Sequence, residues 1–257
     1  MVSRKNSAVS IGNKVTVSYH GYDITQRKKQ QLRRRYCEFR RADLGLQHCY
    51  RNTAKGTDIT PGQGGGICNY GVAVVSTSTV SNNTATEAGG IFNLGTVYLW
   101  RSTLSGNSTG SFGGGADSST ISANSSPVGA AGGIDNSSQE GNTVTLANTI
   151  LAGNANSDCN GDIASQNYNL IGTTSGCAFA AAPHDLVNVS AGIGSLASNG
   201  GPTQTMALLP GSPAINAGNP QGCRAPNGAI IPVDQRGFPR TRPADPVCDI
   251  GAYELAQ

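Results

Sequence analysis

The sequence is poor in charged and aromatic residues, which make up 13% and 5% of its 257 residues. No lysine follows Lys55, and the chain holds three histidines, far apart in sequence: His20, His48 and His184. Such a chain lacks the large side chains that fill the core of an ordinary globular domain. The scattered histidines give no support for a Ser/His/Asp catalytic arrangement.

Long apolar runs and metal-ligand patterns are also missing. No stretch is apolar enough to span a membrane, and residues 1–20 contain no apolar run of signal-peptide length. The cysteines have no C-x-x-C spacing, and Asp117, Asp158 and Asp162 match neither the EF-hand nor the β-roll pattern of calcium sites. The glycines precede no helix and so form no phosphate-binding loop. We therefore predict no metal and no cofactor.

Glycine, by contrast, is abundant, with 35 residues, and much of it belongs to a tandem repeat between Gly64 and Asn154. One phrase, Gly-Gly followed by Ile or Ala, begins at residues 65, 89, 114 and 132. A second phrase, typified by Ser-Thr-Val-Ser-Asn-Asn, occupies residues 78–83, 102–107, 119–124 and, more loosely, 149–154. A repeat in the range of 20 to 50 residues is typical of a solenoid.

Three apolar positions stay in step from coil to coil: Ala73, Val75 and Val80; Val97, Leu99 and Leu104; Val144, Leu146 and Leu151. Apolar and polar residues alternate around them, which indicates short strands with one face buried. Glycine and asparagine at the corners tolerate positive φ angles. We therefore predict an all-β fold, a parallel β-helix over about residues 64–215, whose coils stack at roughly 4.8 Å. A corner ladder is expected from Asn83, Asn107, Asn124 and Asn154.

Two coils depart from the repeat length. Ala116 and Ile121 lie 5 residues apart, where the first two coils use 13, so the third coil lacks a strand. The fourth coil uses 17 residues from Ile134 to Leu151, with an insertion around residues 138–141. We interpret both as drift at coil corners, and the alternative is a notch for a ligand.

Charge divides the chain near Pro61. Residues 1–60 hold 13 Lys and Arg against 4 Asp and Glu, a net charge of +9, whereas residues 61–257 have a net charge of −6. We therefore predict a basic segment over residues 1–60 that does not belong to the repeat and is disordered or partly helical, with a basic helix at Gln26 to Ala42. Because no recognition module accompanies this charge, nucleic acid is not expected as a partner.

The cysteines indicate export. Cys159 and Cys177, and Cys223 and Cys248, flank irregular segments that disulfides would fasten, so we predict these two disulfides. Cys37, Cys49 and Cys68 remain without a predicted partner. Together with the scarcity of lysine, the disulfides favour an extracellular or cell-surface location.

Four C-terminal motifs carry a family resemblance: Asn-Gly-Gly-Pro-Thr at 199–203, Leu-Leu-Pro-Gly-Ser-Pro-Ala-Ile-Asn-Ala-Gly at 208–218, Asp-Gln-Arg-Gly-Phe-Pro-Arg at 234–240 and Cys-Asp-Ile-Gly-Ala-Tyr-Glu at 248–254. The region from Gly64 to Glu254 resembles the choice-of-anchor Q proteins, bacterial surface or secreted proteins. The Gly-Gly-Ile phrases are also similar to repeats of polymorphic outer-membrane proteins. The resemblance implies a right-handed parallel β-helix on the cell surface and brings no catalytic residues. The chain departs from the family in its basic residues 1–60 and in showing neither a signal peptide nor an anchor.

Acidic residues give little sign of catalysis. On the coils Glu87, Asp117, Asp135 and Glu140 do not recur at one position in neighbouring coils, as a lyase or hydrolase site would require. In the closing segment the acids Asp234, Asp249 and Glu254 lie near Arg236, Arg240 and Arg242. We interpret these charges as ion pairs in an irregular cap, about residues 216–257, over the open end of the solenoid.

A binding face is predicted on the second coil. Alternation sends Phe92, Tyr98 and Trp100 outward beside Arg101, and flat aromatic rings stack well on sugars. The competing interpretation is that a neighbouring segment covers these rings. We predict a monomeric, non-catalytic surface or secreted module that binds a glycan or another surface polymer. A polysaccharide lyase or glycoside hydrolase and a purely structural protein are the alternatives, so catalysis stays open.

Overall fold

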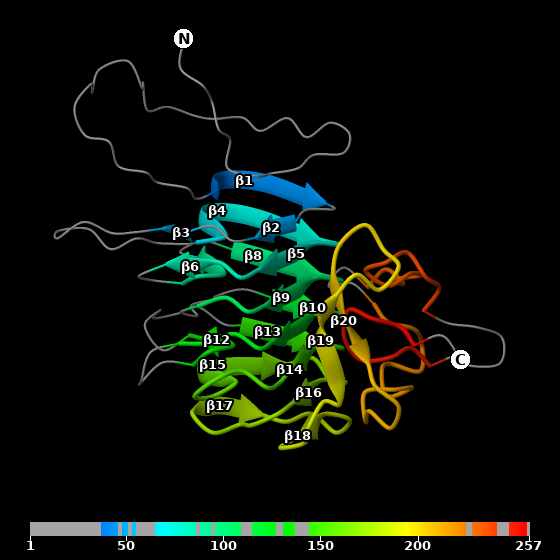
Figure 1. Ribbon diagram of the computed structural model, residues 1–257. Coiled ribbons are helices and arrows are strands. Elements are labelled where there is room, and N and C mark those ends of the chain that lie inside the picture. Colours follow the sequence, from blue (N-terminus) through cyan, green and yellow to red (C-terminus); the bar gives the residue numbers. More distant parts are fainter. Residues whose placement is uncertain are drawn as a thin grey trace, which may run out of the picture.

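The computed structural model describes residues 37–45, 48–50, 53–54, 65–85, 88–93, 96–108, 115–126, 131–136, 144–224, 228–240 and 247–255. This part of the chain is all-β, and it contains no helix that could cross a membrane. Parallel strands stack coil on coil, as predicted, into a parallel β-helix (Figure 1).

Three columns of strands run along the stack. The first is a nine-stranded parallel sheet made of β1 (Cys37–Gly45), β4 (Ile67–Ser76), β7 (Ile91–Asn93), β8 (Thr96–Trp100), β10 (Gly115–Asp117), β12 (Ile134–Asp135), β13 (Val144–Ala147), β15 (Cys159–Ser165) and β17 (Cys177–Ala180). The second is a seven-stranded parallel sheet of β2 (His48–Tyr50), β5 (Thr79–Ser81), β9 (Thr103–Ser105), β11 (Thr120–Ser122), β14 (Ile150–Leu151), β16 (Leu170–Ile171) and β18 (Leu186–Val187). The third is short: β3 (Thr53–Ala54) pairs with β6 (Thr84–Ala85), and isolated bridges extend it through Ser108 and Ser125.

The core lies between the columns and uses the apolar positions that the sequence keeps in step. Val75, Leu99 and Leu146 in the first sheet are fully buried, as are Val80, Ile121 and Leu151 in the second. Burying one such side chain contributes about 1.5–3 kcal/mol. The β-helix is thus held by many medium-sized side chains rather than by a few large ones.

The predicted asparagine ladder is confirmed at the corner after the second sheet. The Oδ1 atom of Asn107 accepts from both the backbone NH and the side-chain amide of Asn83, at 3.1 and 2.9 Å. The same two contacts join Asn107 to Asn124 and Asn124 to Asn154. The ladder ends on Asp158, whose carboxylate accepts from Asn154 and Thr173. Burial nevertheless raises the pKa of Asp158 above its ordinary value.

The third coil is aligned differently from the sequence expectation. Ala116 pairs with Leu99 and Leu146, so Gly115 and Ala116 belong with the second strand of a coil and not with the phrase that contains Ile91. Among the described residues of this coil, no strand corresponds to the first one. The decisive spacing is the 5 residues from Ala116 to Ile121, which equals that from Leu99 to Leu104.

The predicted boundary near Pro61 is wrong for the backbone of residues 37–54. Strands β1, β2 and β3 pair in parallel with β4, β5 and β6, so one coil precedes the predicted start of the β-helix, and residues 37–42 are strand rather than helix. The spacing of Ala42, Leu44 and Cys49 repeats that of Ala73, Val75 and Val80, but the basic residues Arg40 and Arg41 directly before them obscure the pattern. The rest of the predicted basic helix, residues 26–36, lies outside the described residues.

Both predicted disulfides are confirmed. Cys159–Cys177 joins the neighbouring strands β15 and β17, with 5.4 Å between the Cα atoms. Cys223–Cys248 joins two irregular segments near the C-terminus, with a Cα separation of 6.1 Å. The backbone of Cys37, Cys49 and Cys68 lies in β1, β2 and β4.

The C-terminal part of the chain lies along the flank of the β-helix, not over its open end as predicted. The last parallel strand ends at Val187, short of the expected residue 215, and the antiparallel pair β19 (Ile193–Ala197) and β20 (Thr205–Leu208) follows. In Figure 1 these strands and the orange and red segments run beside the stack. We call residues 191–255 the flank module.

A second hydrophobic cluster joins the flank module to the outer face of the second sheet. Ile150 and Leu170, which point outward from β14 and β16, pack with Leu208, Ala214 and Ile250. At Gly251 the two surfaces come so close that a Cβ atom would lie 2.8 Å from Ile150 and 3.0 Å from Thr120. Strands β14 and β16 are therefore buried on both faces.

Candidate functional site

The aromatic face predicted on the second coil does not form as expected. Phe92 is 7% exposed and packs against Ala88, so its predicted exposure is wrong. Tyr98 is 37% exposed, but the indole nitrogen of Trp100 is buried without a hydrogen-bond partner among the described residues. A side chain can point away from the core and still be covered, which strand alternation does not reveal.

Arg101 follows Trp100 in a corner with a φ of 45° and is partly buried. Burial lowers the pKa of Arg101, and the nearby negative charge of Asp234 in the flank module opposes that fall. The flank module therefore contributes to the electrostatic environment of Arg101, and the role of Arg101 in binding stays a prediction.

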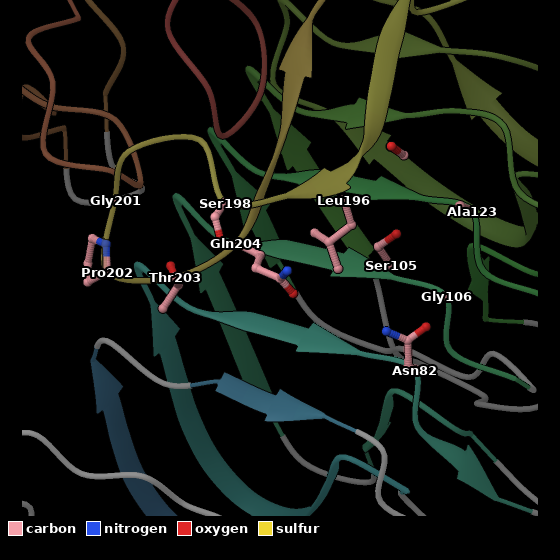
Figure 2. A pocket seen from close by; sticks show the side chains of 11 residues that line it. Asn82, Ser105, Gly106, Ala123, Leu196, Ser198, Gly201, Pro202, Thr203 and Gln204 are labelled. Atoms are coloured by element: carbon pink, nitrogen blue, oxygen red, sulfur yellow. The ribbon is translucent and has the colours of Figure 1, made fainter.

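The structure instead contains a groove of about 750 Å³ between the β-helix and the flank module. Figure 2 shows the side chains around it, which come from the coil corners and the end of β9 on one side and from β19 and the connection between β19 and β20 on the other. The lining residues are Asn82, Ser105, Gly106, Ala123, Ser195, Leu196, Ser198, Gly201, Pro202, Thr203 and Gln204. The volume falls within the roughly 300–1,000 Å³ of typical ligand sites.

One wall of the groove is a row of left-handed corners. Asn82, Gly106 and Ala123 each precede an asparagine of the ladder and have φ angles of 53°, 68° and 58°. They occupy equivalent positions in three successive coils, so they lie above one another at roughly 4.8 Å intervals. This wall is rigid because the ladder holds the next residue of every corner.

The opposite wall is fastened by Gln235, which is fully buried. Its side-chain nitrogen donates to the Thr79 hydroxyl at 3.0 Å, the Thr203 hydroxyl at 2.9 Å and the Gln204 carbonyl at 3.0 Å. Its side-chain oxygen accepts from the Thr103 hydroxyl at 2.7 Å. Gln235 therefore joins two coils of the second sheet to the loop that forms this wall.

The groove offers free hydrogen-bonding groups. The side chains of Asn82, Ser105, Ser195, Ser198 and Gln204 make no hydrogen bond with any part of the chain that the structure describes, although Ser105 is 3% exposed. None of the described lining residues is ionisable. Amides and hydroxyls can both donate and accept, so the groove is suited to an uncharged ligand rich in hydroxyl groups.

The charged residues of the closing segment are engaged inside the flank module. Asp234 pairs with Arg236 at 2.7 Å, and Glu254 pairs with Arg240 at 3.4 Å. The Arg236 guanidinium also lies over the rings of Tyr253 and Phe238, at 3.5 and 4.5 Å from their centres. These pairs fit the predicted structural role rather than a site, but they fasten a flank instead of an end. Arg242 lies outside the described residues.

Burial raises the pKa of Glu254 to about 8; the neighbouring Asp249 adds to the rise, and Arg240 opposes it. The direction agrees with the local charge balance, because three carboxylates face two guanidinium groups. When Glu254 is protonated, one oxygen can still accept from Arg240 and from the backbone NH of Asp249.

This raised pKa predicts a pH-dependent stability. The folded state holds the proton more tightly than the unfolded chain, so the stabilisation is complete below about pH 4.5 and is lost as the pH rises to about 8. We expect the unfolding free energy to fall by roughly 3–5 kcal/mol over that interval, at about 1.4 kcal/mol per pKa unit. Thermal unfolding from pH 5 to 9 measures this change. Glu254→Gln should flatten the profile, and an unchanged slope in that variant would contradict the assignment.

Within the described residues, no three His, Cys, Asp or Glu side chains gather in a group that could hold a metal ion. Asp135 is buried in β12 and does not line the groove. The side chains of Glu87, Asp117 and Glu140 are not among those described.

Sequence reasoning did not find the groove. Its corner wall consists of the residue before each ladder asparagine, a repeat position that in the sequence indicates only a turn. Its other wall includes part of the motif at residues 199–203, which in the sequence carries only the family resemblance. Comparison of the chain with protein-family models, with curated proteins and with solved structures finds no match, so the function rests on this geometry.

Proposed function

We propose that the protein is a secreted or cell-surface, non-catalytic β-helix module that binds a glycan or a similar surface polymer in the groove beside the flank module. The observation that carries this proposal is the set of free amide and hydroxyl side chains around one preformed cavity. The two disulfides support an oxidising, extracellular location. The C-terminal motifs add the resemblance to bacterial surface proteins of the choice-of-anchor Q type.

The chemistry of the lining favours binding over catalysis. Glycoside hydrolysis uses a pair of carboxyl groups, and elimination by a lyase needs a side chain of the enzyme that acts as a base and removes a proton from the substrate. The described lining residues provide neither, but they provide donors and acceptors for sugar hydroxyls and a small apolar surface at Leu196 and Pro202. A polysaccharide lyase or hydrolase remains the competing function, and a purely structural surface protein is the third.

Retention and product release on a polysaccharide panel separate these functions. We expect retention of at least one polymer without release of unsaturated or reducing ends. Ser195→Trp places a large ring at an exposed position of β19, where it fills the groove. We expect retention to weaken by at least about tenfold, because a loss of about 1.4 kcal/mol in binding free energy gives that factor. Product release would favour an enzyme, and absence of both retention and products would leave a structural protein.

Matched variants locate the binding surface. Ser175→Trp places the same ring on an exposed turn outside the groove and should bind like the wild type. Tyr98→Ala tests the outer face of β8, where the exposed aromatic ring remains. If Tyr98→Ala abolished retention and Ser195→Trp did not, the aromatic face would be the binding surface and the groove assignment would be wrong.

A further inference from the structure

The direction of the groove follows from its walls. Asn82, Gly106 and Ala123 come from three successive coils, so the corner wall runs parallel to the axis of the stack. In Figure 1, β19 and β20 also run along the stack rather than around it. On this side of the groove β19 carries Ser195 and Leu196, and Ser198 follows directly after it. A ligand that contacts both walls along their length must therefore be elongated and lie along the axis.

The charge of the ligand follows from the groups that face it. Every free polar side chain in the groove is a neutral amide or hydroxyl, and none of the described lining residues brings a cation. The nearest fixed guanidinium groups of the flank module, Arg236 and Arg240, are held by their own carboxylates. A carboxylate or sulfate entering the groove would lose water without gaining a counter-charge, which is costly.

Small residues on the corner wall leave room for a continuous chain. The side-chain oxygen of Asn82 lies over Gly106, where a Cβ atom would come within 2.5 Å of it. Ala123 follows on the next coil, so the amide of Asn82 is the one large polar group on this wall. Figure 2 shows Asn82 and Ser105 on one side and Gln204 and Leu196 on the other, around the same space. Polar and apolar groups thus alternate around the groove, as the hydroxyl edges and C–H faces of a sugar chain do.

We infer that the groove binds an uncharged, unbranched polysaccharide segment that lies parallel to the β-helix axis. This inference rests on the proposed glycan-binding function and specifies its substrate class. Asn82, Ser105 and Gln204 provide the hydrogen bonds to the hydroxyl groups. Leu196 and Pro202 contact the apolar faces of the sugar rings.

The test compares neutral with anionic polymers and places a charge in the groove. The probes are mixed-linkage β-glucan and unbranched mannan against polygalacturonate and alginate, together with neutral oligosaccharides of increasing length. We expect retention of a neutral polymer that is unchanged by 0.5 M salt, and an affinity at least about tenfold higher for the longer oligosaccharides than for the monosaccharide.

Gln204→Glu should weaken binding at least about tenfold, because the carboxylate cannot donate and is desolvated in the groove. Gln221→Glu, an exposed position of the same module outside the groove, is the matched control and should have no effect.

The outcomes separate the inference from the function on which it rests. Retention of anionic polymers that is lost in Ser195→Trp would keep the groove as the site and overturn the neutral ligand. Equal affinity for the monosaccharide and the longer chains would overturn the axial arrangement. Equal binding by the Gln204→Glu and Gln221→Glu variants would overturn the contact of Gln204 with the ligand. Retention of no polysaccharide at all would overturn both the inference and the proposed function. Thermal unfolding of each variant verifies that a loss of binding is not a loss of fold.

Discussion

Replacement of Asn107 by alanine is expected to destabilise the β-helix by about 3–5 kcal/mol, a large effect for a single substitution. Asn107 is 3% exposed, and its side chain accepts from Asn83 and donates to Asn124 and to the Val80 carbonyl. The substitution removes these buried side-chain hydrogen bonds and opens a gap in the ladder. Chemical denaturation followed by circular dichroism measures the loss.

The neighbouring corner offers a control for this experiment. Asn82→Gly removes an exposed asparagine side chain at a left-handed position, where glycine adopts the same backbone conformation without strain. We expect a change below about 1 kcal/mol for this variant. If the two variants were equally stable, the ladder would not be a major source of stability.

Replacement of Arg240 by methionine is the second large expected effect. Arg240 is fully buried and donates to the carbonyl oxygens of Asp249 and Gly251 and to the Glu254 carboxyl. The substitution leaves two buried carbonyl oxygens and the Glu254 carboxyl without this donor, and each such group costs about 1–3 kcal/mol. We therefore expect a loss of about 3–5 kcal/mol. In this variant we expect the flank module to lose its protection against hydrogen exchange and proteolysis before the coils lose theirs. Hydrogen exchange and limited proteolysis resolve the two regions.

Two further variants sharpen this prediction. Arg224→Met changes an arginine that bonds to the carbonyls of Gly228 and Gln221 in an exposed loop, and it should leave stability nearly unchanged. The double variant Arg240→Met with Glu254→Gln removes the carboxyl together with the guanidinium, so above about pH 8, where Glu254 is ionised, it should recover part of the loss. Uniform destabilisation of module and coils would show that the two parts unfold as one unit.

Local patterns in the sequence determined the architecture of the coils. Three patterns can be recognised within one or two coils. Strand alternation predicted the strands, apolar positions in step such as Leu99 and Leu104 predicted the core, and the recurring asparagine predicted the ladder. The disulfides could also be predicted, because Cys159 and Cys177, and Cys223 and Cys248, flank short irregular segments. Errors arose where the local signal was mixed, as at Ala42 and Leu44, where basic neighbours obscure the spacing of a true coil.

The C-terminal motifs could be recognised but not placed. Their residues turn out to fasten the flank module: Gln235 to Thr79 and Thr103, Arg240 to Gly251, and Gly251 against Ile150. A clue existed in the second sheet, where the outward residue changes from Thr120 to Ile150. A strand that is apolar on both faces must be covered on both, which is incompatible with a module placed only over the end.

The candidate site, finally, was decided by tertiary structure. The corner residues Asn82, Gly106 and Ala123 share one repeat position. The loop residues Thr203 and Gln204 are distant from them in sequence and lie outside the repeat. Their meeting depends on contacts such as that of Gln235 with Thr79, which spans 156 residues. A β-helix repeats its local geometry, so sequence periodicity reveals its core and its corners. Which flank a non-repeating segment covers depends on long-range burial and hydrogen bonding, and no local pattern in this sequence encodes that choice.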